Sequence, residues 1–263
     1  MNPAENLQRL FGLGGKVALV IGATGAFGAA AARALGDAGA TLCLAGSNTT
    51  RLAAMKAEFE AQGIVGHVVD GRPTGAEAAD RIVRTAVELA GGLDILVVAG
   101  GTSAVKPALD MTEDVWSKVM DANVRQTWLI CRSAAAAMIK HGTRGSIILM
   151  SSVRARFATP TGTSAYGPSK AAVDMLTRSF ATEWGPAGIR VNALAPTVFR
   201  SDLTAWLFEE RSDQARKGIL ARIPLGRLAE PEDFRGIVIF LASPASGIVT
   251  GEIIAVDGGF SAN

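Results

Sequence analysis

Short apolar runs alternate with longer helical patterns along most of this chain, and this alternation limits the folds that it can adopt. The apolar runs cover residues 17–21, 41–45, 65–69, 95–99, 146–150 and 190–194, and the helical patterns cover residues 26–38, 51–62, 76–89, 112–139 and 165–184. Apolar strands joined by helices are typical of a parallel sheet that helices cover on both faces. No internal repeat or low-complexity linker interrupts the pattern. We therefore predict one α/β domain over residues 1–263, built on a doubly wound parallel sheet.

Charge and composition exclude several classes of function. The chain has 26 Lys and Arg against 24 Asp and Glu, which is too balanced for a nucleic-acid-binding surface. Its two histidines, His67 and His141, lie far apart without ligand-like neighbours, so we expect no metal site. Cys43 and Cys131 lie in apolar contexts, and we expect both to be buried and reduced. No stretch is typical of a secretory signal or a membrane span, so we expect a cytoplasmic protein.

A glycine-rich loop follows the first apolar run and precedes the first helical pattern. Glycines at such a strand-to-helix turn let the backbone approach a pyrophosphate, which then meets the N–H groups and the dipole of the helix N-terminus. The sequence therefore predicts that this loop binds a dinucleotide. The residues concerned are Gly22, Thr24, Gly25, Ala26, Phe27 and Gly28.

The end of the second apolar run bears on the choice between NADP and NAD. An NAD site usually carries an Asp or Glu here, which binds the ribose 2′-hydroxyl. This chain has Gly46 instead, followed by Ser47 and Asn48, which can donate hydrogen bonds to a 2′-phosphate. Arg51 can do the same, although its position in a helical pattern favours a solvated helix residue. We favour NADP(H), with NAD(H) as the alternative. Asp70, at the end of the third run, can accept a hydrogen bond from the adenine amino group.

Tyr166 is the only tyrosine in the chain, and it lies four residues before Lys170. In a helix this spacing puts both side chains on one face, one turn apart. A nearby positive charge favours the phenolate and lowers the phenol pKa from its usual value near ~10. Such a pair suits proton transfer near neutral pH, although an unrelated surface Tyr and Lys would show the same spacing.

Taken together, these segments resemble the short-chain dehydrogenase/reductase family over almost the whole chain. Residues 22–28 are similar to its glycine loop, and residues 250–259 are similar to its C-terminal signature. Between them lie counterparts of its active-site segments at residues 121–124, 150–153, 166–170 and 190–196. Val97 and Val98 replace the two asparagines of the family's N-N-A-G motif, and Thr197 replaces a glycine.

The resemblance implies a catalytic set of Asn123, Ser152, Tyr166 and Lys170. Tyr166 would exchange a proton with the substrate oxygen, to which Ser152 would donate a hydrogen bond. Lys170 would lower the pKa of Tyr166 and hold the nicotinamide ribose, and Asn123 would support a water beside Lys170. In addition to the glycine loop, the implied cofactor site contains Ser47, Asn48, Arg51, Asp70, Gly71, Ala99, Gly100, Gly101, Tyr166, Lys170, Pro196, Thr197, Val198 and Ser201.

The resemblance also implies a Rossmann-like fold, with the cofactor half over about residues 1–150 and the catalytic and substrate half over about residues 151–263. Members of the family form homodimers or homotetramers, so we expect a homo-oligomer. The implied activity is NAD(P)-dependent interconversion of a small secondary alcohol and a ketone. Two alternatives are a catalytically idle NAD(P)-binding redox sensor, which would not need all four catalytic residues, and a nucleotide-sugar epimerase or dehydratase. Epimerases usually carry a separate substrate domain, for which 263 residues leave little room.

Three segments are expected to line the substrate pocket: residues 102–106, 154–163 and 197–225, the last as a lid. Arg154, Arg156 and Arg200 suggest an anionic or polyhydroxylated substrate. The large apolar side chains of the same segments, Phe157, Phe199 and Trp206, suit an apolar alcohol or ketone equally well.

Overall fold

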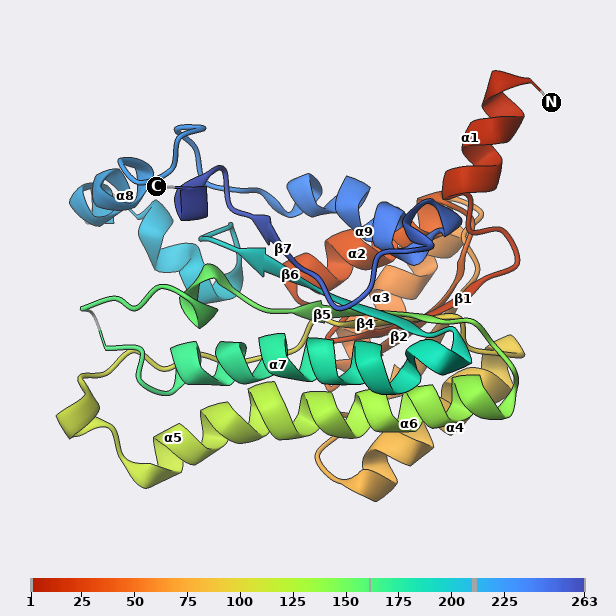
Figure 1. The fold of residues 1–263 in the computed structure, drawn as a ribbon, viewed down its shortest axis with the longest axis horizontal. Helices are drawn as coiled ribbons and strands as arrows, with labels where there is room; N and C mark the ends of the chain where they lie inside the picture. Colours follow the sequence, from red (N-terminus) through yellow and green to blue (C-terminus); the bar gives the residue numbers. More distant parts are fainter. Residues whose placement is uncertain (1, 161, 210–211, 263) are drawn as a thin grey trace.

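A seven-stranded parallel sheet forms the centre of the computed structural model, which describes residues 2–160, 162–209 and 212–262 (Figure 1). Its strand order is β3-β2-β1-β4-β5-β6-β7. The strands are β1 (Val17–Ile21), β2 (Thr41–Gly46), β3 (Gly66–Asp70), β4 (Ile95–Val98), β5 (Ser146–Met150), β6 (Arg190–Pro196) and β7 (Ile253–Val256). The predicted doubly wound sheet is confirmed. The sequence prediction lacks β7, which is a four-residue edge strand without a recognised helical pattern before it.

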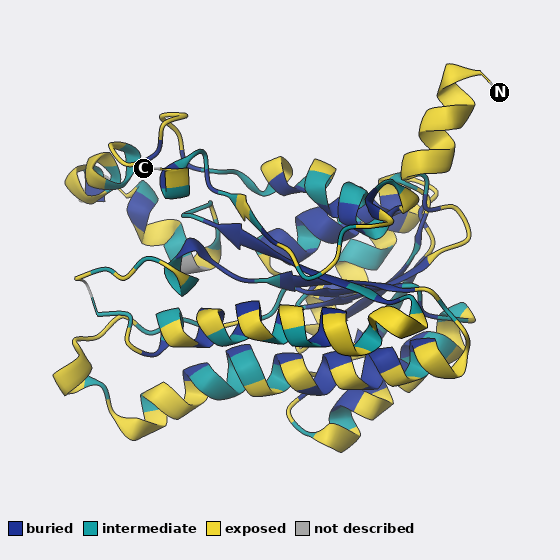
Figure 2. Ribbon diagram, viewed as in Figure 1, coloured by how far each residue is buried: buried dark blue, intermediate teal, exposed yellow. Residues whose placement is uncertain are grey.

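Helices cover both faces of the sheet, so its strands lie between two helical layers (Figure 2). One layer contains α2 (Ala26–Asp37), α3 (Thr49–Glu60) and α9 (Arg235–Ala242), and the other contains α4 (Ala76–Ala90), α6 (Gln126–Lys140) and α7 (Tyr166–Trp184). Successive strand residues face opposite layers. In β1, for example, Leu19 packs with α4 and α6, whereas Ala18 and Val20 pack with α2 and α9.

The helix predicted over residues 112–139 is interrupted, which corrects the sequence prediction. It begins as α5 (Glu113–Met120) and continues as α6, and a π-helical turn over Asp121–Arg125 joins the two. In this turn the N–H of Gln126 donates to the carbonyl of Asp121, five residues earlier. Such a turn adds one residue to the helical spacing and is frequent at functional sites. It contains Asn123.

The described residues between 197 and 225 include a 3₁₀ helix, Asp202–Phe208, and α8 (Asp213–Leu220). In Figure 1 both lie beyond the arrowheads of β6 and β7, beside the C-terminus of the chain. The N-terminal helix α1 (Pro3–Phe11) was not predicted; a capping box of Asn2 and Glu5 starts it, and all of its residues are exposed.

Cys43 and Cys131 are both buried, as the sequence predicts. Burial raises the pKa of the Cys43 thiol to about 12, so neither its position nor its chemistry suits a reactive thiolate. Within the described ranges, no helix has the length and apolar character needed to cross a bilayer.

Candidate active site

The predicted site residues gather at the carboxyl ends of the central strands. Gly22 follows β1, Gly100 lies just beyond β4, Ser152 follows β5 and Thr197 follows β6. Open α/β sheets bind ligands in the crevice outside these ends, where the strand order reverses. In this sheet the reversal falls between β1 and β4.

The glycine loop forms a close-packed cradle at this crevice. Gly22 has φ +77°, and a Cβ atom there would lie 2.8 Å from the backbone nitrogen of Gly100. A Cβ atom on Gly28 would lie 2.1 Å from the carbonyl oxygen of Gly22, so only glycine fits. No side chain of the described residues caps the start of α2, which leaves the N–H groups of its first turn for a ligand. The cradle therefore fits a diphosphate.

The side chain of Phe27 does not face this cradle. Phe27 is 3% exposed, and its ring packs edge to face on Phe234 with centroids 5.5 Å apart. The side chain of Phe27 therefore belongs to the core, and only the backbone of this residue can contribute to the predicted cofactor site.

Ser47, Asn48 and Arg51 lie together where β2 ends and α3 begins. The Oδ1 atom of Asn48 accepts the N–H of Arg51 at 3.0 Å and so caps α3. Ser47 and Arg51 are exposed, and Asp70 lies beside Gly46 on the neighbouring strand. The group thus presents polar donors, and no carboxylate on β2 itself, at the edge of the crevice.

Asn123 is buried in the π-helical turn, where it joins three segments. Its Oδ1 atom accepts the N–H of Thr102 at 2.8 Å, and its Nδ2 atom donates to the carbonyl of Thr102 and to the hydroxyl of Ser169, both at 2.9 Å. Ser169 in turn donates to the carbonyl of Tyr166 at 2.7 Å. Asn123 therefore connects the loop after β4 to the start of α7.

Tyr166 is the first residue of α7, and its phenol hydrogen-bonds with the hydroxyl of Ser152. The guanidinium of Arg154 lies close enough to favour the phenolate. Burial outweighs both effects and raises the pKa of Tyr166 above its usual value of 10.0. The sequence prediction that Lys170 lowers this pKa is not met, because the groups that lower it are Ser152 and Arg154.

Lys170 is 4% exposed and lies one turn after Tyr166. Its Nζ atom donates to the carbonyl of Met150 at 2.7 Å and lies 5.7 Å from the centroid of the Tyr166 ring. A Cβ atom on Gly101 would lie 3.6 Å from Nζ and 3.1 Å from Oδ1 of Asn123, so these predicted residues share one small space. Burial lowers the pKa of Lys170 to about 8, and the charge of Asp174 acts in the opposite direction.

A family model described as enoyl-(acyl carrier protein) reductase matches residues 22–261. An uncharacterised oxidoreductase of Mycobacterium tuberculosis is 47% identical over 255 residues, which cover 96% of this chain and 93% of that one. The human dehydrogenase/reductase SDR family member 4 is 37% identical over 267 residues, which cover 97% and 91%. This chain belongs to the short-chain dehydrogenase/reductase family.

The fold of this family is also found in a similar solved structure. A gluconate 5-dehydrogenase from Burkholderia cenocepacia, solved with NADP and tartrate, superposes with a TM-score of 0.91 at 29% identity. The match covers 97% of this chain and 99% of that chain.

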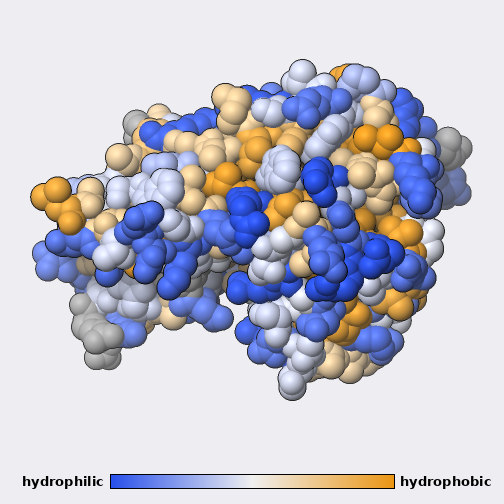
Figure 3. All heavy atoms as spheres, turned by 90° about the horizontal axis from the view of Figure 1, so that it is seen from below, coloured by the Kyte–Doolittle hydropathy of each residue, from blue (hydrophilic) through white to orange (hydrophobic). Residues whose placement is uncertain are grey.

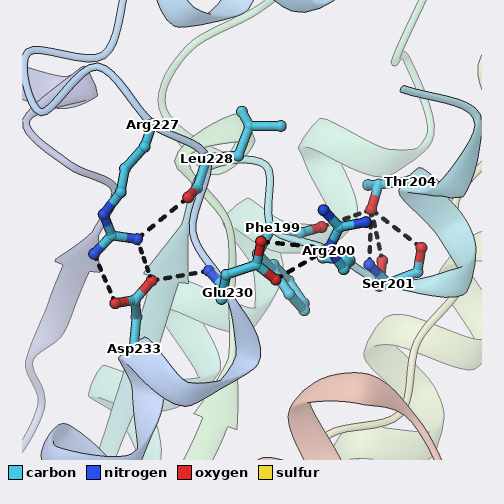
Figure 4. A network of polar contacts seen from close by, with 8 residues as sticks. All are labelled: Phe199, Arg200, Ser201, Thr204, Arg227, Leu228, Glu230 and Asp233. Atoms are coloured by element: carbon cyan, nitrogen blue, oxygen red, sulfur yellow. Dashed lines mark hydrogen bonds and ion pairs between the residues drawn. The ribbon is translucent and has the colours of Figure 1, made fainter. Parts of the chain in front are cut away.

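In the present chain, polar contacts hold the residues that follow β6 in place (Figure 4). Ser201 and Thr204 cap the 3₁₀ helix, with their hydroxyl oxygens 3.0 Å apart. Arg200 pairs with Glu230 at 3.2 Å and stacks on Phe208 at 3.8 Å. The guanidinium of Arg200 therefore already has partners within the chain. This contact disfavours Arg200, among the three arginines named above, as a binding residue for an anionic substrate.

Two buried polar residues on α7 of this short-chain dehydrogenase/reductase, Ser169 and Asp174, were not predicted from the sequence. Ser151 is fully buried and donates to Asp174, which is 6% exposed and lies one turn after Lys170 on α7. Asp174 follows Lys170 by four residues, as Lys170 follows Tyr166, and this repeated spacing is the signal that could have revealed it. Ser169 does not share this four-residue spacing, so the sequence offered no comparable pattern for it.

Proposed function

We propose that this protein is an NADP(H)-dependent oxidoreductase that interconverts a secondary alcohol and a ketone. The observation that carries the proposal is the convergence of Ser152, Tyr166 and Lys170 beside the glycine cradle. Family membership supports the reaction class. In this proposal Tyr166 would be the proton donor, Lys170 the cationic group and the glycine loop the dinucleotide cradle, side by side at the carboxyl ends of the central strands.

The residues around the crevice fit a nicotinamide dinucleotide. Gly22, Gly28 and the first turn of α2 would hold the diphosphate, and Gly100 would let it approach β4. Ser47, Asn48 and Arg51 favour the 2′-phosphate of NADP, in agreement with the NADP held by the Burkholderia relative. When bound, the nicotinamide supplies or accepts the hydride.

The protein's own residues would manage one proton and the substrate oxygen. Ser152 would donate a hydrogen bond to this oxygen, and Tyr166 would give it a proton during reduction or take one during oxidation. The raised pKa of Tyr166 keeps the phenol protonated at neutral pH, which favours reduction. Below about pH 8, Lys170 is charged and would hold the ribose hydroxyls. General acid–base catalysis of this kind typically contributes ~10²–10⁴-fold.

The proposal is tested by following the absorbance of the reduced nicotinamide in a panel of ketones and alcohols. The panel contains sugars, oxo acids, acyl thioesters and steroids, each with NADPH and with NADH. We expect turnover of at least one carbonyl class with a higher kcat/KM for NADPH than for NADH. Tight NADPH binding with no turnover of any class would contradict the proposed reaction and favour an idle sensor.

A further inference from the structure

The backbone of Arg154 connects the two residues that would handle the substrate oxygen, Ser152 and Tyr166. Arg154 follows Ser152 by two residues, and its N–H donates to the Ser152 hydroxyl at 3.1 Å. Its carbonyl oxygen faces the first turn of α7, where a Cβ atom on Gly167, the residue after Tyr166, would lie 3.1 Å from it. Arg154 is therefore packed between the serine and the start of the helix that carries the phenol.

Contacts within the chain also hold the guanidinium of Arg154 in place. Its Nη1 atom donates to the carbonyls of Phe157 and Ala158, both at 3.4 Å. The guanidinium carbon lies 5.7 Å from the centroid of the Phe260 ring, within the range of a cation–π interaction. Phe260 is itself buried and belongs to the same apolar cluster as Val153. The position of the half-buried charge is therefore set by the packing around it.

Among the described residues, no carboxylate pairs with this guanidinium. In contrast, Arg227 pairs with both oxygens of Asp233, at 2.6 and 2.8 Å (Figure 4). A charge that no counter-ion neutralises acts on the polar groups beside it, and a half-buried position screens it less than open solvent does. The charge of Arg154 can therefore act on the groups at the start of α7.

The phenol of Tyr166 is the acidic group on which this charge acts. Burial raises the pKa of Tyr166, and the charge of Arg154 lowers it. Burial likewise lowers the pKa of Arg154, and the charge of the Tyr166 phenolate raises it. Each side chain thus favours the charged form of the other, as two opposite charges at short range do.

The other charged side chains near the phenol act on different partners. The Nζ atom of Lys170 donates to the carbonyl of Met150 at 2.7 Å, and the charge of Asp174 acts on Lys170. Arg222 contributes a second cation at the Phe260 ring, and its charge acts on Arg154. Neither Lys170 nor Arg222 therefore replaces Arg154 beside the phenol.

Charged residues on the elements that pack against α7 also act elsewhere. In the π-helical turn, Asp121 pairs with Arg125. In the loop after β5, Arg156 is exposed, and its charge acts on Asp174. Within the described ranges, Arg154 is thus the cation that favours the phenolate.

We propose that Arg154 is a positioning residue of this site: its fixed charge stabilises the phenolate of Tyr166, which accepts the hydroxyl proton of an alcohol, and its N–H holds the Ser152 hydroxyl. Burial lowers the pKa of Lys170 to about 8, so its ammonium is lost at alkaline pH, whereas a guanidinium stays charged. The phenolate thus has a cation beside it that alkaline pH does not remove. This inference rests on the proposed function, because it adds a residue to the same site.

A titration of the phenol tests this inference without any turnover. Tyr166 is the only tyrosine in the chain, so protein labelled with 3-fluorotyrosine gives one fluorine NMR resonance, whose shift follows the protonation of this phenol. The fluorine atom also lowers the phenol pKa and so brings the midpoint closer to the pH range in which proteins stay folded. We expect the midpoint to rise by at least about half a pH unit in Arg154→Gln, because the phenolate loses a nearby positive charge.

Further variants separate the charge of this side chain from its shape. Arg154→Met keeps the apolar stem beside Phe260 without the charge, and its midpoint should match that of Arg154→Gln. Arg154→Lys keeps a positive charge, and its midpoint should lie closer to that of the wild type. Arg156→Gln, the matched control, removes an exposed charge from the same loop and should leave the midpoint unchanged. Wild-type midpoints in both neutral Arg154 variants, or an equal shift in Arg156→Gln, would overturn the inference.

The pH profile of alcohol oxidation distinguishes this role from a merely structural one. The substrate is the best alcohol of the panel, with NADP⁺ in excess. Because the phenolate must accept the hydroxyl proton, we expect the acid limb of kcat/KM to move to higher pH in Arg154→Gln, with a loss of roughly threefold or more below the limb and little loss above it. A loss by the same factor at every pH would overturn the inference. A wild-type protein that oxidises no alcohol would instead contradict the proposed function, and the fluorine titration would still decide the role of Arg154.

Discussion

The positive charge of the buried Lys170 side chain is stabilised by the carboxylate of Asp174, which also belongs to α7. Asp174 lies one turn further along the helix, where Ser151 donates a hydrogen bond to it. The charges around Asp174 are those of Lys170, Arg156 and Arg178. Because Lys170 titrates at about 8, a modest change in this balance alters its charge within the range where enzymes are assayed.

Asp174→Asn tests this balance. The amide can still accept the Ser151 hydrogen bond, but it no longer favours the ammonium, so the pKa of Lys170 falls further below its ordinary value. A lysine is charged below its pKa; the charge is therefore lost at a lower pH. We expect the alkaline limb of the pH profile of kcat/KM for ketone reduction to move to lower pH.

The control for this measurement is Asp80→Asn, which removes an exposed carboxylate of α4. In this control, the alkaline limb of the pH profile of kcat/KM should lie at the same pH as in the wild-type enzyme. A wild-type profile in Asp174→Asn would mean that Asp174 does not support the charge of Lys170.

At the scale of single elements, Gly22 and Gly28 of the glycine loop lie so close to neighbouring backbone atoms that no side chain fits at either position. Gly28→Ala would place its Cβ atom 2.1 Å from the Gly22 carbonyl, so the loop must shift. We expect both a lower melting temperature and weaker NADPH binding, measured by differential scanning fluorimetry and by fluorescence titration.

Gly25→Ala is the matched variant in the same loop. Its Cβ atom would lie 3.4 Å from the same carbonyl, which is an ordinary contact, and its φ of −77° suits alanine. It should therefore keep the wild-type melting temperature while weakening NADPH binding. Equal melting temperatures for Gly28→Ala and the wild type would contradict the close packing.

Most elements could be predicted from sequence because their apolar residues repeat with the period of a strand or a helix. The π-helical turn could not, because Asp121–Arg125 keeps a helical pattern on both sides and the extra residue leaves no mark in it. Tyr166 and Lys170 could be predicted from their spacing. The pairing of Arg200 with Glu230 could not, because only the folded chain brings these two residues together.

Three aromatic rings join distant parts of the molecule. Phe234 is fully buried and packs edge to face on Phe27 of α2 and on Phe199 after β6, with centroids 5.5 and 5.1 Å apart. The glycine cradle and the segment after β6 therefore share one packing unit. We expect Phe234→Leu to lower the free energy of unfolding by roughly 1–2 kcal/mol, measured by urea denaturation.

The same substitution should also weaken NADPH binding, because it loosens the support of α2. Phe11→Leu, which alters a partly exposed ring on α1, is the control and should change neither quantity. Loss of stability without any loss of NADPH affinity would show that the rings do not couple the core to the cradle.

The whole molecule presents exposed apolar side chains on the layer of α5, α6 and α7, where hydrophobic and hydrophilic groups are interspersed (Figure 3). They include Trp116, Trp128 and Met175. The homo-oligomer expected from the family remains a prediction. Light scattering coupled to gel filtration should give two or four times the chain mass of 27.1 kDa. A mass of one chain at micromolar concentration would contradict it.

Turnover by Tyr166→Phe tests the central claim most directly, with the best ketone of the panel as substrate and NADPH affinity measured in parallel by fluorescence. The substitution removes only the phenolic oxygen, so the account predicts wild-type-like NADPH binding and a loss of kcat of at least about 10²-fold. Lys170→Ala should in comparison lower both affinity and rate. A kcat of Tyr166→Phe within about tenfold of wild type would contradict the assignment of Tyr166 as the proton donor.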